Sequence, residues 1–226
     1  MAINKEKYLQ IISELKNKAT LVAVSKTKPL GEIQALYDLG QRDFGENYVQ
    51  ELADKYEALP KDIRWHFIGH LQSNKVKYIA SFVYLIHSVD SEKLLAEINK
   101  QGQKLKRTID CLLQVHIAEE ETKFGFDEHE LKEVLNGFKV TSSANVSIRG
   151  LMGMASFSDD ENKIRTEFKK LQHLYTNYSV SFSTFNLLSM GMSSDYKTGI
   201  EEGSNIVRIG SLLFGERPSQ VPSSQD

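Results

Sequence analysis

Short runs of apolar residues recur along the chain, and longer segments with apolar residues at helical spacing separate them. The first run, residues 21–25, is apolar up to Ser25, a pattern typical of a parallel strand that is buried on both faces. Seven further runs have the length and residue types of strands. The eight predicted strands span residues 21–25, 42–45, 63–69, 83–89, 109–117, 146–152, 184–190 and 205–210.

The segments around these strands predict helices. The first helix, over residues 4–18, precedes the first strand and carries apolar residues at helical spacing. Another begins near residue 46, where Asn47 and Gln50 are spaced like a capping pair. Further helical patterns cover residues 30–39, 74–80, 91–100, 128–135, 159–175 and 195–202.

Strict alternation of strands and helices predicts a parallel sheet. Eight such units in a chain of 226 residues favour a closed (β/α)8 TIM barrel, an α/β fold, over an open doubly wound sheet. The first strand is not followed by a glycine-rich dinucleotide fingerprint, which also weighs against the open sheet. We therefore expect one barrel domain over residues 1–217 and a flexible C-terminal tail over residues 218–226.

Lys26 directly follows the first predicted strand, and Pro29 then stops regular structure. Desolvation of an ammonium group is costly, so a lysine at the end of a buried strand loses its proton more readily than one in water. An unprotonated amine attacks aldehydes to form Schiff bases. The alternative is a lysine whose stem packs on the strand while its ammonium group reaches solvent.

Two loops near the C-terminal end of the chain carry small residues suited to an anion. In (β/α)8 barrels, phosphate groups bind near the loops after strands seven and eight. Here Ser193 lies in a serine-rich helix start after strand seven, and Gly210 and Ser211 open a short helix after strand eight. Either loop alone fits ordinary capping chemistry, but together they favour a phosphorylated ligand. Opposite a strand-end lysine, that ligand suggests a phosphorylated aldehyde such as pyridoxal 5′-phosphate (PLP).

The amino-acid composition limits the classes of partner that we expect the chain to bind. Charged residues make up 26% of the chain and hydrophobic ones 40%, with a net charge of −2, so we expect no general attraction for nucleic acid or anionic membranes. No apolar run has the length needed to span a bilayer. The single cysteine, Cys111, excludes an internal disulfide framework and fits a reducing cytoplasm. We expect a cytoplasmic monomer.

Five blocks of consecutive residues resemble the signature segments of the pyridoxal phosphate homeostasis protein family. Its members are single-domain relatives of the alanine racemase N-terminal barrel. Together the blocks fall within residues 21–215, which is nearly the whole chain. They read VSKTKP (24–29), FGENYVQE (44–51), HFIGHLQSNK (66–75), LSMGMS (188–193) and VRIG (207–210).

The resemblance implies a role for seven residues in holding PLP. It places the Schiff base on Lys26, whereas Lys28 matches a second lysine that is not the usual anchor. Arg208 falls at the position that faces the pyridine nitrogen. The resemblance also places Ser193, Gly210 and Ser211 at the phosphate, and Asn47 and His70 at the rim of the cofactor.

Three functions remain open. The first, which we favour, is a carrier or regulator for PLP (vitamin B6) homeostasis and amino-acid and keto-acid balance, without catalytic residues and with apo PLP-dependent enzymes as candidate recipients. The second is a PLP-dependent amino-acid racemase, which needs an acid or base on the opposite face of the ring. The third is a barrel lyase or aldolase that uses Lys26 on a sugar phosphate.

Several polar residues stay unassigned. His66 and His70 are four residues apart, but Gly69 between them places them at a strand end rather than on a helical face, so we expect no metal site. His87 faces either the mouth or the core. The sequence assigns no role to Lys123 in the loop after strand five.

Overall fold

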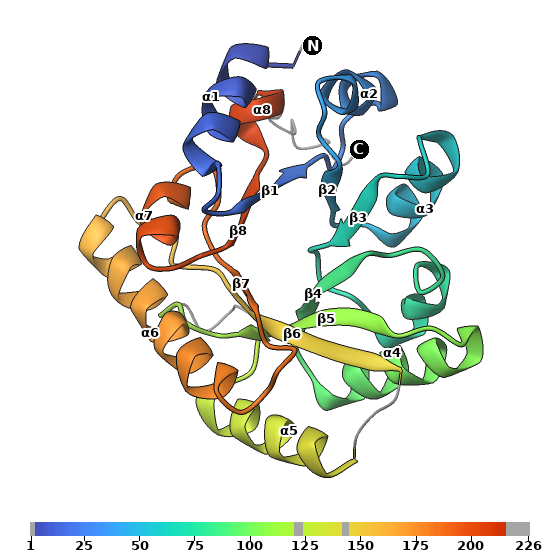
Figure 1. Ribbon diagram of the computed structural model, residues 1–226, viewed down its shortest axis with the longest axis vertical. Helices are drawn as coiled ribbons and strands as arrows, with labels where there is room; N and C mark the ends of the chain where they lie inside the picture. Colours follow the sequence, from blue (N-terminus) through green and yellow to red (C-terminus); the bar gives the residue numbers. More distant parts are fainter. Residues whose placement is uncertain (1–2, 120–123, 142–144, 216–226) are drawn as a thin grey trace, which may run out of the picture.

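The computed structural model describes residues 3–119, 124–141 and 145–215, and these form a closed barrel of eight parallel strands (Figure 1). Neighbouring strands pair in chain order, and β1 pairs with β8 to close the barrel. The predicted (β/α)8 fold is thus confirmed. The strands are β1 (Thr20–Val24), β2 (Asp43–Glu46), β3 (Arg64–Phe67), β4 (Leu85–Val89), β5 (Ile109–Val115), β6 (Val146–Gly153), β7 (Leu187–Ser189) and β8 (Ile206–Ile209).

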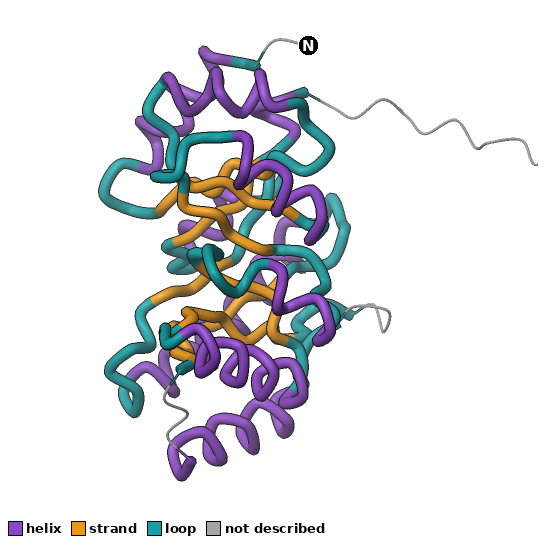
Figure 2. The backbone as a smooth tube through the Cα atoms, turned by 90° about the vertical axis from the view of Figure 1, so that its right-hand side faces the viewer, coloured by secondary structure: helices purple, strands orange, loops and turns teal. Residues whose placement is uncertain are grey.

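The helices surround the strands (Figure 1), and the tube view from the side shows the strands in the middle of the molecule (Figure 2). They are α1 (Lys5–Leu15), α2 (Leu30–Asp38), α3 (Val49–Ala58), α4 (Glu92–Leu105), α5 (Glu128–Thr141), α6 (Glu161–Ser179), α7 (Tyr196–Glu201) and α8 (Ser211–Phe214). The segment after β3 is a 3₁₀ helix, η1 (Ser73–Tyr78). The predicted tail and Lys123 fall outside the described residues. Over the described ranges, no helix is both long and apolar enough to cross a membrane.

Two apolar layers hold the barrel together. The larger layer lies between the strands and the helices, where amphipathic helices bury one face; in α4 this face includes Leu94 and Ile98. The smaller layer fills the barrel interior with Val22, Leu85, Leu112, Met152 and Ile206. Because side chains alternate between the two faces of a strand, β1, β4, β5, β6 and β8 each contribute buried apolar residues to both layers.

The predicted capping pair of Asn47 and Gln50 is wrong. Helix α3 begins at Val49, with Tyr48 at the N-cap position and no side-chain capping bond. Gly69 packs against the backbone of Asn47 so closely that a Cβ atom on Gly69 would lie 2.3 Å from the Asn47 carbonyl oxygen. This tertiary contact holds Asn47 outside the helix and directs it toward the barrel mouth.

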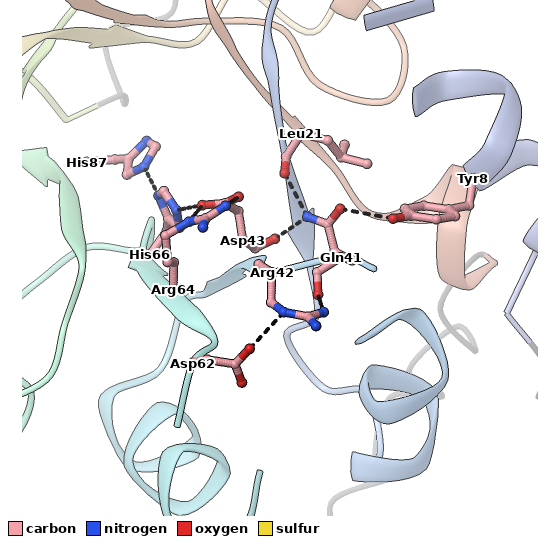
Figure 3. A network of polar contacts seen from close by, with 9 residues as sticks. All are labelled: Tyr8, Leu21, Gln41, Arg42, Asp43, Asp62, Arg64, His66 and His87. Atoms are coloured by element: carbon pink, nitrogen blue, oxygen red, sulfur yellow. Dashed lines mark hydrogen bonds and ion pairs between the residues drawn. The ribbon is translucent and has the colours of Figure 1, made fainter. Parts of the chain in front are cut away.

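Polar side chains replace part of the inner apolar layer. Asp43, His66 and His87 come from the adjacent strands β2, β3 and β4 and contact one another inside the barrel (Figure 3). The distances are 3.0 Å from Asp43 Oδ1 to His66 Nε2 and 2.8 Å from His66 Nδ1 to His87 Nε2. At the amino-terminal end of β3, Arg64 binds Asp43 through two hydrogen bonds.

Candidate functional site

A pocket of about 640 Å³ opens at the carboxyl ends of the strands, where (β/α)8 barrels carry their active sites. The volume suits a small phosphorylated ligand. Six of the seven predicted site residues line this pocket: Lys26, Asn47, Ser193, Arg208, Gly210 and Ser211. They come from loops that are far apart in the sequence, so only closure of the barrel brings them together.

Strand alternation directs Lys26 into the pocket. Val22 belongs to the apolar cluster inside the barrel, and both Val24 and Lys26 line the pocket above it. Lys28, two residues further on, donates a hydrogen bond from Nζ to the carbonyl oxygen of Phe214 at 2.9 Å. The second lysine is therefore engaged with the end of α8.

The loops after β7 and β8 are bonded to each other. The backbone N–H of Gly210 donates to Ser193 Oγ at 3.2 Å. The loop after β7 is itself held by Asp195, whose Oδ1 accepts a hydrogen bond from the Met192 N–H at 2.5 Å. Gly191 in this loop has φ +95°, a backbone conformation that favours glycine. The small residues predicted to bind phosphate thus share one wall of the pocket.

Arg208 is a buried cation that lines the pocket from β8. Its Nη1 donates to the carbonyl oxygen of Ser189 at 3.0 Å and to Ser189 Oγ at 2.5 Å, and its Nη2 donates to the carbonyl oxygen of Gly153 at 3.0 Å. Burial lowers the pKa of Arg208 to about 10, although Asp195 acts in the opposite direction. The guanidinium remains charged at neutral pH, so it disfavours protonation of any ring nitrogen that faces it.

Arg208 joins the polar residues of the barrel interior through Ser189. His87 Nδ1 lies 3.0 Å from Ser189 Oγ, which links Asp43, His66, His87, Ser189 and Arg208 into one chain of contacts that we call the inner network. His87 therefore faces the core. Burial lowers the pKa of His87 well below its usual value, and the nearby His66 and Arg208 add to the effect.

Sequence reasoning missed Ser189 as a support for Arg208. Ser189 is fully buried at the end of β7, where its hydroxyl group contacts both His87 and Arg208. Leu187 packs against the interior apolar cluster. The spacing of two residues between Leu187 and Ser189 was the signal in the sequence that could have identified Ser189. Side-chain alternation alone would have placed its hydroxyl inside the barrel.

The residues of the pocket fit PLP. Asn47 Oδ1 is buried and makes no hydrogen bond to the described residues, a state that is costly unless a ligand or water supplies the donor. A lysine amine, two joined serine- and glycine-containing loops and a buried arginine complete the lining. This set offers a nucleophile, an anion seat and a ring partner to a phosphorylated aldehyde.

His70 is the predicted site residue that does not line the pocket. Its Nδ1 lies 3.0 Å from Asp90 Oδ2, and its ring stacks on Phe124 with a centroid distance of 4.3 Å. The side chain is 46% exposed. His70 is therefore held by its neighbours on the outer rim.

Comparisons with known proteins identify the family of this chain. The family model of the alanine racemase N-terminal domain matches residues 4–218. The pyridoxal phosphate homeostasis protein of Aquifex aeolicus is 44% identical over 89% of this chain and 88% of its own length. The corresponding protein of Schizosaccharomyces pombe is 39% identical over 90% of this chain and 86% of its own length.

Solved structures show the same fold. PipY of Synechococcus elongatus with PLP bound superposes with a TM-score of 0.84 at 33% identity, covering 93% of this chain and 99% of PipY. The alanine racemase of Bartonella henselae shares the fold, with a TM-score of 0.69 at 17% identity over 94% of this chain and 60% of the racemase. The chain belongs to the pyridoxal phosphate homeostasis protein family, within the alanine racemase N-terminal domain family.

Proposed function

We propose that this chain binds PLP in the pocket at the barrel mouth and serves in PLP homeostasis. The observation that carries the proposal is the convergence of Lys26, Arg208 and the joined loops at Ser193 and Gly210 on one pocket. The homeostasis names of the relatives and the PLP-bound PipY structure support it.

Each residue would have a separate task. When bound, PLP supplies an aldehyde that forms a Schiff base with an unprotonated lysine amine; Lys26 would provide that amine. Ser193, Gly210 and Ser211 would hold the phosphate, and Arg208 would face the ring nitrogen. Asn47 would accept a hydrogen bond from PLP through its buried Oδ1, at the edge of the pyridine ring.

The same pocket argues for a carrier rather than an enzyme. Inversion at an α-carbon needs an acid or base on each face of the ring. The titratable residues that line the described pocket are Lys26, Lys28 and Arg208. Lys28 is bonded to Phe214, and Arg208 is a permanently charged group held by three hydrogen bonds. We therefore propose a cytoplasmic, monomeric carrier that passes PLP to apo PLP-dependent enzymes.

Borohydride reduction tests the binding mode. The purified protein incubated with PLP should turn yellow, and reduction should attach the cofactor permanently to one lysine. Peptide mapping should find it on Lys26, and Lys26→Ala should abolish the attachment while Lys28→Ala retains it. A protein that stays colourless, or a label on Lys28, would overturn the proposal.

A second experiment separates carrier from racemase. PLP-loaded protein should restore activity to an apo PLP-dependent enzyme, and it should not invert L-alanine or L-serine at an enzyme-like rate. Lys26-dependent inversion of either amino acid would reject the carrier in favour of the racemase.

A further inference from the structure

A cluster of mostly buried charged side chains is bonded to the turn that carries Lys26. Lys55 on α3 and Glu46 at the end of β2 have side chains that are 6% and 0% exposed. Lys55 Nζ donates to Glu46 Oε1 at 2.8 Å, to Glu51 Oε1 at 2.7 Å and to the carbonyl oxygen of Ser25 at 2.8 Å. These three acceptors match the three donors of an ammonium group. We call Ser25, Glu46, Glu51 and Lys55 the turn cluster.

The turn cluster holds the residues on both sides of Lys26. Ser25 Oγ donates to Glu46 Oε1 at 2.5 Å, and the backbone N–H of Thr27 donates to Glu51 Oε1 at 2.6 Å. The Lys28 N–H then closes the turn on the carbonyl oxygen of Ser25 at 3.0 Å. Lys26 is thus one of the two central residues of a turn that is bonded to β2 and α3.

The backbone of this turn needs such support. Thr27 has φ +63°, in the left-handed region that β-branched residues rarely adopt. Such a conformation persists where the surrounding structure over-determines it, and it is concentrated at functional sites. The bond from Thr27 N–H to Glu51 acts on this residue directly.

Burying this many charges is not an efficient source of stability. Isolated buried ion pairs seldom stabilise a fold more than apolar residues of the same volume. Burial raises the pKa of Glu46 to about 6, against the opposing effect of Lys55 and Ser25. Its second oxygen, Oε2, has no hydrogen-bond partner among the described residues. The contribution of the turn cluster to stability does not explain why these charges are buried, whereas a role in positioning the turn does.

We propose that Glu51 and Lys55 are positioning residues that fix the Ser25–Lys28 turn and so aim the amine of Lys26 at PLP. This rests on the proposed binding of PLP by Lys26. The two residues act through the turn and do not line the PLP pocket.

The test uses a matched pair at Glu51, whose side chain is 23% exposed. Glu51→Ala removes the acceptor for the Thr27 N–H, whereas Glu51→Gln keeps an oxygen there. The first measurement is hydrogen–deuterium exchange of the cofactor-free protein, resolved at Thr27 and Lys28. Glu51→Ala should accelerate exchange at both amides by at least about tenfold, and Glu51→Gln should stay within about threefold of the wild type. Exchange in β5 should not change.

The second measurement is the dissociation constant for PLP. Glu51→Ala and Lys55→Met should each weaken binding by about tenfold or more, with Glu51→Gln close to the wild type. If Lys55→Met does not fold, the Glu51 pair carries the test. Unchanged exchange in Glu51→Ala, or faster exchange with unchanged PLP binding, overturns the inference. A wild-type protein that does not bind PLP overturns the proposed function instead, and the exchange measurement still decides whether Glu51 fixes the turn.

Discussion

The two buried polar groups of this barrel both begin on β2 and then diverge. Asp43 at the start of the strand leads into the inner network, which crosses the interior to Arg208. Glu46 at the end of the strand points to the opposite face and joins the turn cluster between β2, α3 and the end of β1. Both groups end beside the pocket at the barrel mouth, one at Arg208 and the other at the turn of Lys26.

The two groups differ in the direction in which the pKa values of their buried side chains are shifted. In the inner network, burial alone would raise the pKa of Asp43, but hydrogen bonds from Arg64 and His66 lower it below its usual value. Burial also lowers the pKa of His87. In the turn cluster, burial raises the pKa of Glu46 to about 6. A fall in pH therefore lowers the free energy of unfolding through the inner network and raises it through Glu46 of the turn cluster.

Removing the central cation of the turn cluster should have the largest effect. Lys55→Met leaves Glu46 as a buried carboxylate without its partner, and such a change costs about 3–5 kcal/mol of the free energy of unfolding. The loss should shrink as the pH falls, because Lys55 holds down the pKa of Glu46 and its removal lets the buried carboxylate take up a proton more readily. Urea unfolding at pH 8 and pH 5 measures both values.

A surface lysine provides the control for this change. Lys100 pairs with Glu97 at 3.4 Å and is 61% exposed, so Lys100→Met should change the free energy of unfolding by less than about 0.5 kcal/mol. Equal losses for the two variants at pH 8 would show that Lys55 is not a buried, paired charge.

Acid should weaken the inner network through His87. The unfolded side chain takes up a proton near pH 6.5, whereas the folded one resists protonation, so its contribution is complete above pH 6.5 and is lost as the pH falls below that value. His87→Gln should reduce this loss between pH 7 and pH 5, at a cost of about 1–3 kcal/mol at pH 7 for disrupted hydrogen bonds.

The exposed His129 serves as the reference for that titration, because it is 78% exposed. Free energies of unfolding are compared between each variant and the wild type at every pH, since Glu46 acts in the opposite sense between about pH 4.5 and 6. A pH dependence that His87→Gln leaves unchanged, or that His129→Gln removes, would contradict the assignment to His87.

Ser189→Ala should have a smaller effect, because it removes one of three acceptors of Arg208. The carbonyl oxygens of Ser189 and Gly153 continue to hold the guanidinium. We expect a loss of about 1–2 kcal/mol in the free energy of unfolding and a PLP affinity reduced by about threefold. Thr176→Ala, which removes an exposed hydroxyl group from α6, is the control. A loss of PLP binding as large as that of Lys26→Ala would mean that Ser189 contacts PLP itself.

His70→Ala should have the smallest effect, because His70 belongs to neither buried group. Its contact with Asp90 is partly exposed, with the His70 side chain 46% and the Asp90 side chain 11% exposed, and surface pairs contribute about 0–1 kcal/mol. PLP affinity should stay within about twofold of the wild type. A tenfold loss would return His70 to the rim of the cofactor, where the family resemblance places it.

The sequence by itself determined the barrel and the location of its pocket. Alternating apolar runs and helical stripes are local patterns, because each depends on spacing within a few residues. Eight of them in a row leave few arrangements other than a closed parallel barrel. The position of Lys26 after strand one, and of small residues after strands seven and eight, then follows from the rule that these strand ends meet at one mouth.

Only the tertiary structure decided which polar groups touch. Whether His87 faces the mouth or the core depends on the register of β4 against β3 and on side chains from β7. Asn47 has the residue type and spacing of a helix cap, yet contact with Gly69 holds it outside α3. Lys55 has the spacing of an ordinary surface lysine that pairs with Glu51 on its own helix, but the fold adds two buried acceptors, Ser25 after β1 and Glu46 on β2. Contacts between distant segments depend on register and packing, which local spacing does not encode.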